Sequence, residues 1–283
     1  MEARGEARAR LVALLKEILA NKARDVAELR SRPRLAPAVV REPIEVLRAL
    51  RRDADSALRL VAEVKLRSPS AGPLSRALAP ADRALAYAEA GAAMISVLCD
   101  GAFFDGSWKH LAAARSRLDG AGRAIPLLAK EFVVDVRQIE EARDRGADAV
   151  LLIARIVSAS RLAELAHAAR AERVEPFIEV VDERELEAAL AAGARVVGVN
   201  ARDLDTLRMD GARAARVLAA VPPETVAVHF SGVRDGRDVI EVARGRADAA
   251  LIGEALMRED DPRELLRTLC SCHPGRDAQA ERS

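Results

Sequence analysis

Aromatic residues are scarce in this sequence, since phenylalanine, tyrosine and tryptophan together make up only 2% of its 283 residues. The core must therefore be built from alanine, valine, leucine and isoleucine. The formal net charge is +1 at pH 7, which gives no electrostatic basis for binding nucleic acid. No apolar run approaches the roughly 18 residues that a membrane-spanning helix requires. We therefore expect neither nucleic-acid binding nor membrane insertion.

Cysteine is also rare, and the three cysteines, Cys99, Cys270 and Cys272, include no C-x-x-C pair. No set of histidine, aspartate and glutamate has metal-ligand spacing either. An odd number of cysteines in a chain of this size is typical of a reducing compartment. The charged start MEARGEARAR is not followed by a signal-type apolar stretch. The sequence therefore predicts a cytoplasmic protein without a metal site.

The first 58 residues have helical periodicity. The segment ARLVALLKEILANKARDVAELR carries an apolar stripe with charges opposite, SRPRLAP interrupts it, and EPIEVLRALRR begins a second helix with Pro43 near its first turn. We expect residues 1–58 to form a helical extension that lies over one end of the following domain.

From residue 59 onward, eight short apolar runs alternate with segments of helical periodicity. The runs lie at 60–64, 93–98, 125–129, 148–153, 174–180, 195–199, 226–230 and 248–252. Strands that alternate with helices indicate parallel βαβ units. Four helix-to-strand junctions resemble one another, among them EAGAAMISVL and DRGADAVLLI, which suggests repeated units. We predict an α/β fold, a (β/α)8 TIM barrel over residues 59–270, with a disordered tail at 271–283.

A doubly wound open sheet is the main competing architecture. Such a sheet rarely needs eight evenly spaced units, and no G-x-G-x-x-G motif follows the first strand. The barrel is therefore favoured. In a (β/α)8 barrel the chemistry is carried at the C-terminal ends of the strands, so polar residues should gather there.

Polar residues do follow the ends of six of the eight expected strands, whereas the strand beginnings are mostly apolar. They are Glu63, Lys65 and Ser68 after the first strand, Lys130 after the third, Glu179 after the fifth, Asn200 and Arg202 after the sixth, Ser231 and Gly232 after the seventh, and Gly253 and Glu254 after the eighth. Two lysines and two glutamates that point into one cavity form a candidate acid–base cluster. The gathering of polar residues at one end of the barrel indicates an enzyme.

Single members of this cluster also have structural interpretations. Glu63 could be a buried counter-ion of Lys65, and Lys130 could extend to solvent along its aliphatic stem. Glu179 is flanked by apolar residues in PFIEV, so we expect a desolvated carboxylate there. The joint placement of all four at one end of the barrel favours the functional interpretation.

The loops after the last two strands point to a phosphorylated ligand. SGV follows the seventh strand and GEAL the eighth, which brings glycine backbones and helix N-termini to one corner of the barrel mouth. Free N–H groups at such a corner are the usual phosphate site of this fold. Glu254 would repel phosphate, so we expect its side chain to point away while its N–H contributes.

Five segments resemble the indole-3-glycerol phosphate synthase family. They are VAEVKLRSPSAGPLS, ISVLCDGAFFDGSWKHL, IPLLAKEFVVDVRQIEEARDRGADAVLLI, FIEVVDERELEAALAAGARVVGVNARDL and LIGEALMREDDP. The resemblance runs in one order from about residue 11 to residue 265. It implies a (β/α)8 barrel whose N-terminal helical extension covers the active-site mouth.

The resemblance also implies the reaction. The substrate would be 1-(2-carboxyphenylamino)-1-deoxyribulose 5-phosphate, a phosphorylated small molecule. Ring closure joins the aryl carbon that bears the carboxylate to the C2′ carbonyl, and loss of CO2 and water gives indole-3-glycerol phosphate. No cofactor is needed, which agrees with the missing nucleotide motifs. Members of the family are often monomeric.

The same resemblance assigns roles to individual residues. Lys130 would be the general acid that protonates the carbonyl oxygen, and Glu179 would handle protons in later steps. Lys65 would bind the substrate carboxylate and assist dehydration, with Glu63 tuning it. The remaining expected contacts are Asn200, Arg202 and Ser68 to the substrate's polar groups; Phe104, Phe132, Pro69 and Leu152 as an apolar slot for its ring; and Arg67, Ser231, Gly232, Gly253 and Glu254 around the phosphate.

One departure from the family pattern leaves alternatives open. Phe230 stands before the SG of the seventh strand, where the family has glutamate. The chain could therefore be a divergent paralogue with altered or lost activity that binds a related phosphorylated ligand or a partner protein. The phosphoribosylanthranilate isomerase of the same fold needs a Cys/Asp pair, and Cys99 has no obvious aspartate partner. The retained lysines and glutamates favour the synthase.

Overall fold

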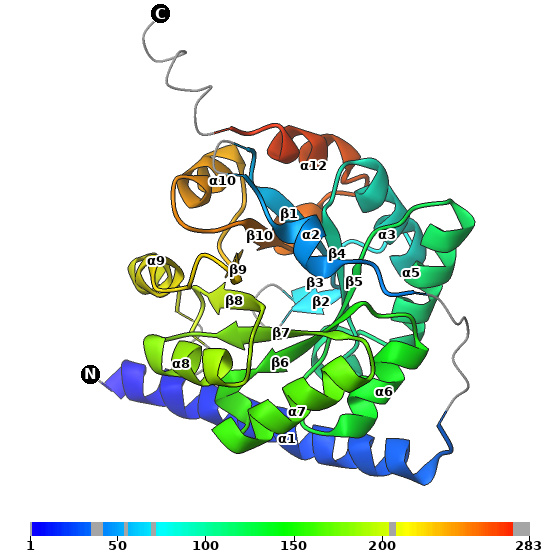
Figure 1. Cartoon of the computed structure of the whole chain (residues 1–283), viewed down its shortest axis with the longest axis vertical. Coiled ribbons are helices and arrows are strands. Elements are labelled where there is room, and N and C mark those ends of the chain that lie inside the picture. The colour runs from blue at the N-terminus through cyan, green and yellow to red at the C-terminus, as the bar shows by residue number, and fades with distance from the viewer. Residues whose placement is uncertain (1, 35–41, 54–55, 69–71, 204–207, 274–283) are drawn as a thin grey trace, which may run out of the picture.

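The computed structural model describes residues 2–34, 42–53, 56–68, 72–203 and 208–273, with side chains from residue 15 onward. Eight parallel strands close into a barrel in the order β1-β10-β9-β8-β7-β6-β5-β4 (Figure 1). The predicted (β/α)8 barrel is confirmed, and each strand begins and ends within two residues of its apolar run. The strands are β1 (Arg59–Val64), β4 (Met94–Leu98), β5 (Leu127–Lys130), β6 (Ala149–Ile153), β7 (Glu175–Val180), β8 (Val196–Asn200), β9 (Val226–Phe230) and β10 (Ala249–Ile252).

Helices follow the strands around the outside of the barrel. They are α3 (Pro80–Glu89), α4 (Gly101–Phe104), α5 (Trp108–Gly120), α6 (Val136–Asp144), α7 (Ala159–Ala171), α8 (Glu183–Ala191), α9 (Gly211–Ala219), α10 (Gly236–Ala243), α11 (Glu254–Arg258) and α12 (Arg263–Cys270), with a 3-10 turn at Ala154–Ile156. Aspartates cap several of them; Asp182, for example, accepts the backbone N–H of Glu185 at the start of α8. A two-stranded antiparallel pair, β2 (Arg67–Ser68) and β3 (Gly72–Pro73), lies in the loop after β1.

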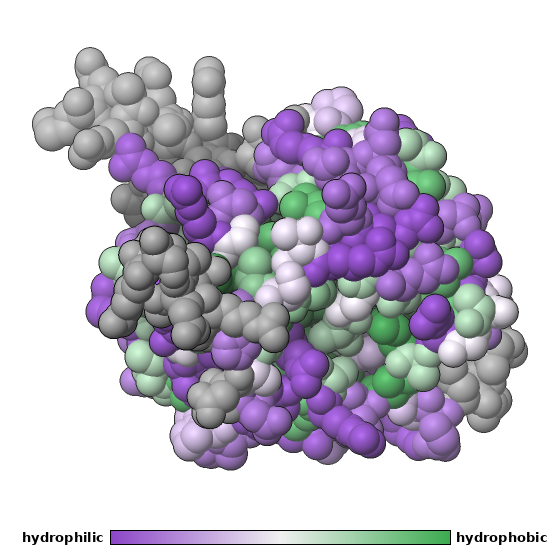
Figure 2. Space-filling view, turned by 90° about the horizontal axis from the view of Figure 1, so that it is seen from above, coloured by the Kyte–Doolittle hydropathy of each residue, from purple (hydrophilic) through white to green (hydrophobic). Residues whose placement is uncertain are grey.

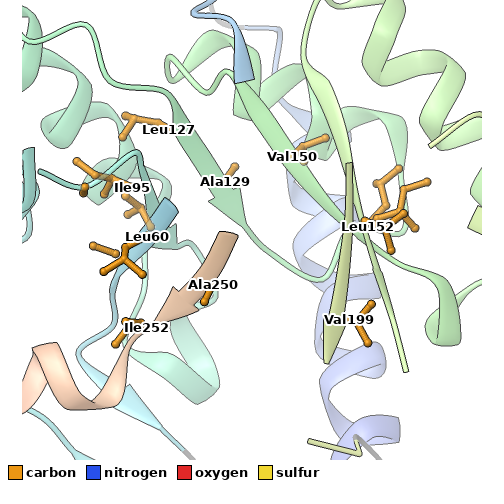
Figure 3. Packing of buried hydrophobic residues seen from close by; sticks show 14 of the residues in the cluster. Leu60, Ile95, Leu127, Ala129, Val150, Leu152, Val199, Ala250 and Ile252 are labelled. Atoms are coloured by element: carbon orange, nitrogen blue, oxygen red, sulfur yellow. The ribbon is translucent and has the colours of Figure 1, made fainter. Parts of the chain in front are cut away.

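Alternate residues of each strand face opposite sides of the barrel wall, because side chains in a strand alternate with a period of two. In β1, Leu60 and Ala62 belong to the cluster between strands and helices, whereas Val61 belongs to the cluster inside the barrel. Glu63 therefore points inward, with Lys65 on the same side. Figure 3 shows part of the outer cluster, which is built almost wholly from aliphatic side chains.

The amino-terminal end of the barrel is closed by α2 (Val46–Leu50). Val46 and Leu50 are buried and join the cluster inside the barrel. The backbone N–H of Ile44 donates to Asp148, next to the start of β6, at 2.8 Å. Arg51 donates to the carbonyl of Pro223, shortly before β9, at 2.6 Å. The second helix of the extension is thus an apolar plug, shorter than the sequence indicated.

The long helix α1 (Glu2–Ser31) lies against the other end of the barrel. In Figure 1 it runs along one side of the molecule, past α7 and α6. Arg30 forms an ion pair of 2.6 Å with Asp135, the N-cap of α6. Arg34, which follows the helix, pairs with Asp144 at the end of α6 at 3.0 Å. The extension therefore contacts both ends of the barrel.

A buried lysine fixes α1 to the barrel mouth. The side chain of Lys22 is 2% exposed, and its Nζ lies 2.8 Å from Asp25, 2.8 Å from Asp100 and 3.0 Å from Glu131. Asp100 follows β4, and Glu131 follows β5. Because a buried ammonium needs compensating charge, α1 can occupy this position only while these carboxylates face it.

Three carboxylates share this one ammonium, and the pKa values reflect the imbalance. Although burial opposes the charged form, the carboxylates of Glu131 and Asp100 raise the pKa of Lys22. Burial raises the pKa of Glu131 to about 7; the ammonium of Lys22 opposes this rise, and the negative charge of Asp100 adds to it. Glu131 is therefore the member of the cluster that titrates near neutral pH.

The outer surface is strongly polar. Figure 2 shows one face, on which hydrophilic residues are widespread and hydrophobic ones appear as smaller patches between them. Among the described residues, Met209 is the only large apolar side chain that is exposed. No helix in the described part of the chain has the length and hydropathy to cross a membrane.

The apolar plug yields a prediction for stability. Leu50→Ala should lower the free energy of unfolding by roughly 2 to 5 kcal/mol, because it leaves a cavity at the closed end of the barrel. Arg48→Ala, at an exposed position of the same helix, is the matched control. Urea denaturation of both variants measures the difference, and an equal effect of the two would contradict the role of α2 as a plug.

The Lys22 cluster yields a prediction for pH dependence. Since the pKa of Glu131 in the folded protein, about 7, lies above its usual value of 4.5, the folded state binds this proton more tightly than the unfolded state does. The associated stability is fully present below pH 4.5 and is lost as the pH rises through 7. A shift of this size corresponds to roughly 3 kcal/mol.

Glu131→Gln should therefore lose less stability than the wild-type protein between pH 5 and pH 8 in urea denaturation. Glu164→Gln, at an exposed position of α7, should follow the wild-type pH dependence. Identical pH dependence in all three proteins would show that Glu131 does not titrate in this window.

Candidate active site

A cavity of about 1190 Å³ opens at the carboxyl ends of the strands. The predicted polar residues that line it come from β1, β5, β7 and β8 and from the loops that follow β1, β8, β9 and β10. They are Glu63, Lys65, Ser68, Lys130, Glu179, Asn200, Arg202, Ser231, Gly232, Gly253 and Glu254. The closed sheet thus brings into one cavity residues that are up to 191 positions apart in the sequence, from 63 to 254.

Glu63 and Lys65 form an ion pair on the inner face of β1. Lys65 Nζ lies 2.7 Å from Glu63 Oε1, and the Glu63 side chain is 3% exposed. Burial opposes ionisation of Glu63, but the ammonium groups of Lys65 and Lys130 hold its pKa below the usual value. Its second oxygen, Oε2, is buried and has no hydrogen-bond partner among the described residues. Glu63 is therefore a desolvated carboxylate that stays ionised at neutral pH.

Lys130 and Glu179 form a second pair at the ends of β5 and β7. Lys130 Nζ lies 3.4 Å from Glu179 Oε2, a loose contact that leaves the ammonium partly uncompensated. The side-chain amide of Asn200 donates to the other carboxylate oxygen of Glu179 at 2.8 Å. The backbone N–H of Arg202 donates to Asn200 Oδ1 at 3.0 Å, which fixes the amide orientation. Glu179 is 2% exposed, as its apolar flanks predicted.

Phe230 lies on the inner face of β9, within the same cavity. It is 1% exposed, and its ring centroid is 4.9 Å from Lys130 Nζ. Because phenylalanine replaces the glutamate of the family pattern, the sequence predicts a less polar site at this position, with one carboxylate fewer. The structure adds that the ring face meets the ammonium of Lys130, and such a contact attracts the cation.

Two loops form the corner that the sequence assigns to phosphate. Ser231 (φ +69°) and Gly232 (φ +90°) adopt consecutive left-handed conformations directly after β9. Such a backbone is unfavourable for serine and often marks a functional loop. The His229 ring Nε2 lies 2.9 Å from the Ser231 carbonyl, which helps to hold the loop.

The second loop packs against the Glu63–Lys65 pair. A Cβ atom at Gly253 would lie 2.5 Å from Glu63 Oε1 and 3.2 Å from Lys65 Nζ, so a side chain there would displace the ion pair. Glu254 begins α11, and its carboxylate pairs with Arg258 one turn later at 2.7 Å. The carboxylate is thus engaged along its own helix.

The apolar wall differs from the prediction at one position. Phe104 and Phe132 line the cavity with ring centroids 6.1 Å apart. Leu152 does not line it: the side chain is fully buried in the outer cluster, where Figure 3 shows it. The flanking residues of β6, Leu151 and Ile153, face the cavity instead. The prediction chose the wrong face of β6.

Arg67 and Pro69 are the remaining predicted contacts of the substrate. Arg67 is not among the described residues that line the cavity; its guanidinium pairs with Asp105 at 3.2 Å and donates to the Ala102 carbonyl. The structure therefore does not place Arg67 in the cavity, and its assignment to the phosphate site stays a prediction. Pro69 lies outside the described residues.

Several lining residues were not predicted from the sequence. Leu15 and Ile18 of α1 reach the cavity, as do Leu98, Leu251 and Met209. The apolar stripe of the N-terminal segment indicated a buried face, but a helical pattern alone does not say what that face covers. Among the described residues, no group of three or more histidine, cysteine, aspartate or glutamate side chains could hold a metal ion.

Comparison with known proteins agrees with this geometry. The family model for indole-3-glycerol phosphate synthase matches residues 15–269. The indole-3-glycerol phosphate synthase of Mycobacterium ulcerans is 41% identical over 241 residues, which covers 84% of this chain and 86% of that protein. The Streptomyces coelicolor protein named indole-3-glycerol phosphate synthase 2 is 45% identical over 212 residues, or 75% of this chain and 80% of that protein.

Solved structures share the fold at low identity. A 3-hexulose-6-phosphate synthase aligns with a TM-score of 0.60 at 17% identity, covering 76% of this chain and all of that chain. The thiamine phosphate pyrophosphorylase of Pyrococcus furiosus aligns with a TM-score of 0.56 at 15% identity, covering 76% of this chain and 95% of that chain. These likenesses show the barrel alone. The family model and the sequence relatives show more, and on their evidence the chain belongs to the indole-3-glycerol phosphate synthase family.

Proposed function

We propose that this protein converts 1-(2-carboxyphenylamino)-1-deoxyribulose 5-phosphate to indole-3-glycerol phosphate, CO2 and water. The observation that carries the proposal is the pair of Lys–Glu contacts in one cavity, Lys65 with Glu63 and Lys130 with Glu179. Two phenylalanine rings and the glycine-containing loops after β9 and β10 also line that cavity. The reaction needs proton donors and acceptors, a place for the substrate's aromatic ring and a place for its phosphate. This cavity has candidates for all of these.

Lys130 is the proposed general acid for ring closure. As the aryl carbon attacks the C2′ carbonyl, negative charge develops on the carbonyl oxygen, and an ammonium proton neutralises it. The loose contact of 3.4 Å with Glu179 supports this role, because it leaves N–H groups of Lys130 available to the substrate. Loss of CO2 then restores the aromaticity of the ring.

Glu179 is the proposed acid–base group of the later steps, in which a ring proton is removed and the new hydroxyl leaves as water. Asn200 holds one of its carboxylate oxygens at 2.8 Å, so the other oxygen faces Lys130 and the cavity. A buried carboxylate with a fixed orientation can accept a proton without first reorganising solvent.

Lys65 is proposed to bind the substrate carboxylate and to assist dehydration. Its pairing with Glu63 at 2.7 Å fixes its position beside Gly253. Arg202 and Ser68 line the same cavity and supply further polar contacts to the substrate. The Phe104–Phe132 pair, with Leu151 in place of Leu152, is the proposed slot for the aromatic ring.

The phosphate is proposed to bind at the loops after β9 and β10, through Ser231, Gly232, Gly253 and the backbone N–H of Glu254. The start of α11 at Glu254 leaves backbone N–H groups without intrahelical partners. The pairing of the Glu254 carboxylate with Arg258 supports the expectation that this side chain does not oppose the anion.

Three general expectations also remain proposals. We propose that the protein acts in the cytoplasm, as a monomer, in tryptophan biosynthesis. We further propose that residues 1–58 are a helical extension of a catalytic barrel at residues 59–270. Of the expected tail at 271–283, residues 274–283 lie outside the described part of the chain.

The role of Lys130 can be tested by substitution. Lys130→Met should lower kcat roughly 100- to 10,000-fold, because removal of a general acid usually costs that much. Indole fluorescence follows product formation directly. Lys109→Met, at an exposed position of α5, should retain wild-type activity. If Lys130→Met also turned over normally, the protein would have to use another proton donor.

The phosphate corner can be tested at Gly232. Gly232→Ala should raise KM for the phosphorylated substrate at least about tenfold, because alanine is strained at a positive φ and disturbs the loop's N–H groups. The added Cβ would also lie 2.6 Å from Met209. Gly120→Ala, where a Cβ meets no atom within 4 Å, is the matched control. A change in kcat with no change in KM would argue against phosphate binding at this loop.

A further inference from the structure

We propose that Phe230 is a positioning residue for Lys130, which it holds by a cation–π contact between its ring face and the lysine ammonium. The inference rests on the proposed role of Lys130 as general acid. Phe230 need not touch the substrate in this proposal; it acts through the lysine.

The contact has the geometry and burial that make such an interaction effective. Lys130 Nζ lies 4.9 Å from the ring centroid, within the roughly 6 Å over which a ring attracts a cation. Phe230 is 1% exposed and the Lys130 side chain is 17% exposed. Little water therefore competes with the ring, and desolvated contacts of this kind are the stronger ones.

The ring itself is held firmly. Phe177 packs against it with centroids 5.4 Å apart. Gly198 of β8 lies beneath it: a Cβ there would come within 2.8 to 3.0 Å of three ring atoms. The ring thus fills the space that a side chain at position 198 would occupy. Because the Phe230 ring packs this closely on the strand backbone, it cannot turn away from the lysine without clashes.

The described partners of Lys130 explain why its ammonium needs a further contact to hold its position. Its one ion pair with a described residue is the 3.4 Å contact with Glu179, which is long for a hydrogen bond that fixes a geometry. A flexible lysine held only at that distance would sample several positions. The ring attracts the charge but offers no lone pair, so it restrains Nζ without accepting one of its three protons. The N–H groups needed for proton transfer stay available.

The test weakens the ring's electrostatic attraction without changing its shape. Residue 230 is replaced with phenylalanine that carries one, two or three ring fluorines, which progressively withdraw electron density from the ring face. Activity on the carboxyphenylamino-deoxyribulose phosphate is followed by indole fluorescence. We expect kcat to fall stepwise, by roughly 5- to 10-fold at the trifluoro analogue, with little change in KM. The same series at Phe177 should leave kcat unchanged, because that ring contacts Phe230 and not the lysine.

Two ordinary variants support the series. Phe230→Tyr retains a ring and should keep most of kcat, whereas Phe230→Met fills similar volume without a ring and should lose as much as the trifluoro analogue. If kcat did not change along the fluorine series, or changed equally at positions 230 and 177, the cation–π role would be overturned. This holds even if Phe230→Met fails to fold.

Lys130→Met, measured alongside, separates this inference from the proposed function. If Lys130→Met is inactive and the fluorine series is flat, only the role of Phe230 fails. If Lys130→Met retains wild-type kcat, the assignment of the general acid fails, and the role of Phe230 fails with it.

Discussion

A closed barrel has one small interior, and every second residue of its strands must occupy it. That constraint explains how the charges of this protein are arranged. Glu63 is tolerated inside because Lys65, two residues along the same strand, lies on the same side at 2.7 Å. Glu179 is tolerated because Asn200 and Lys130 reach it from two other strands. Each of these two carboxylates thus depends on a partner that strand alternation or barrel closure places beside it.

The two ends of the barrel are closed by different physical means, both supplied by the N-terminal extension. Leu50 and Val46 fill the amino-terminal end, where an apolar plug needs no partner beyond close packing. At the carboxyl-terminal end the neighbouring loops carry Asp100 and Glu131, so the helix that lies there must bring a cation, Lys22. Packing suits a permanently closed end. A charged anchor suits the end at which polar residues must stay available for chemistry.

Much of this site could be predicted because charged residues mark the inward face of their own strands. Glu63, Lys130 and Glu179 each show which alternate positions point inward, so the cluster follows from strand phase and the barrel rule. In β6 the run AVLLI has no polar residue to mark the phase, and Leu152 was assigned to the wrong face. Arg67 lies outside the cavity lining for another reason: its ion pair with Asp105 joins residues that no periodic pattern relates. The same holds for Lys22, whose two partners on the barrel are 78 and 109 residues away, at positions 100 and 131.

Charge balance within the cavity explains how an aromatic side chain can stand where the family pattern has a glutamate. Lys65 and Lys130 are matched by Glu63 and Glu179, so the four groups carry no net charge when all are ionised. A third carboxylate would make the cluster negative towards a substrate that brings its own carboxylate and phosphate. The ring of Phe230 attracts the ammonium at 4.9 Å and adds no charge. It therefore restrains the lysine while leaving the cavity electrostatically open to an anionic substrate.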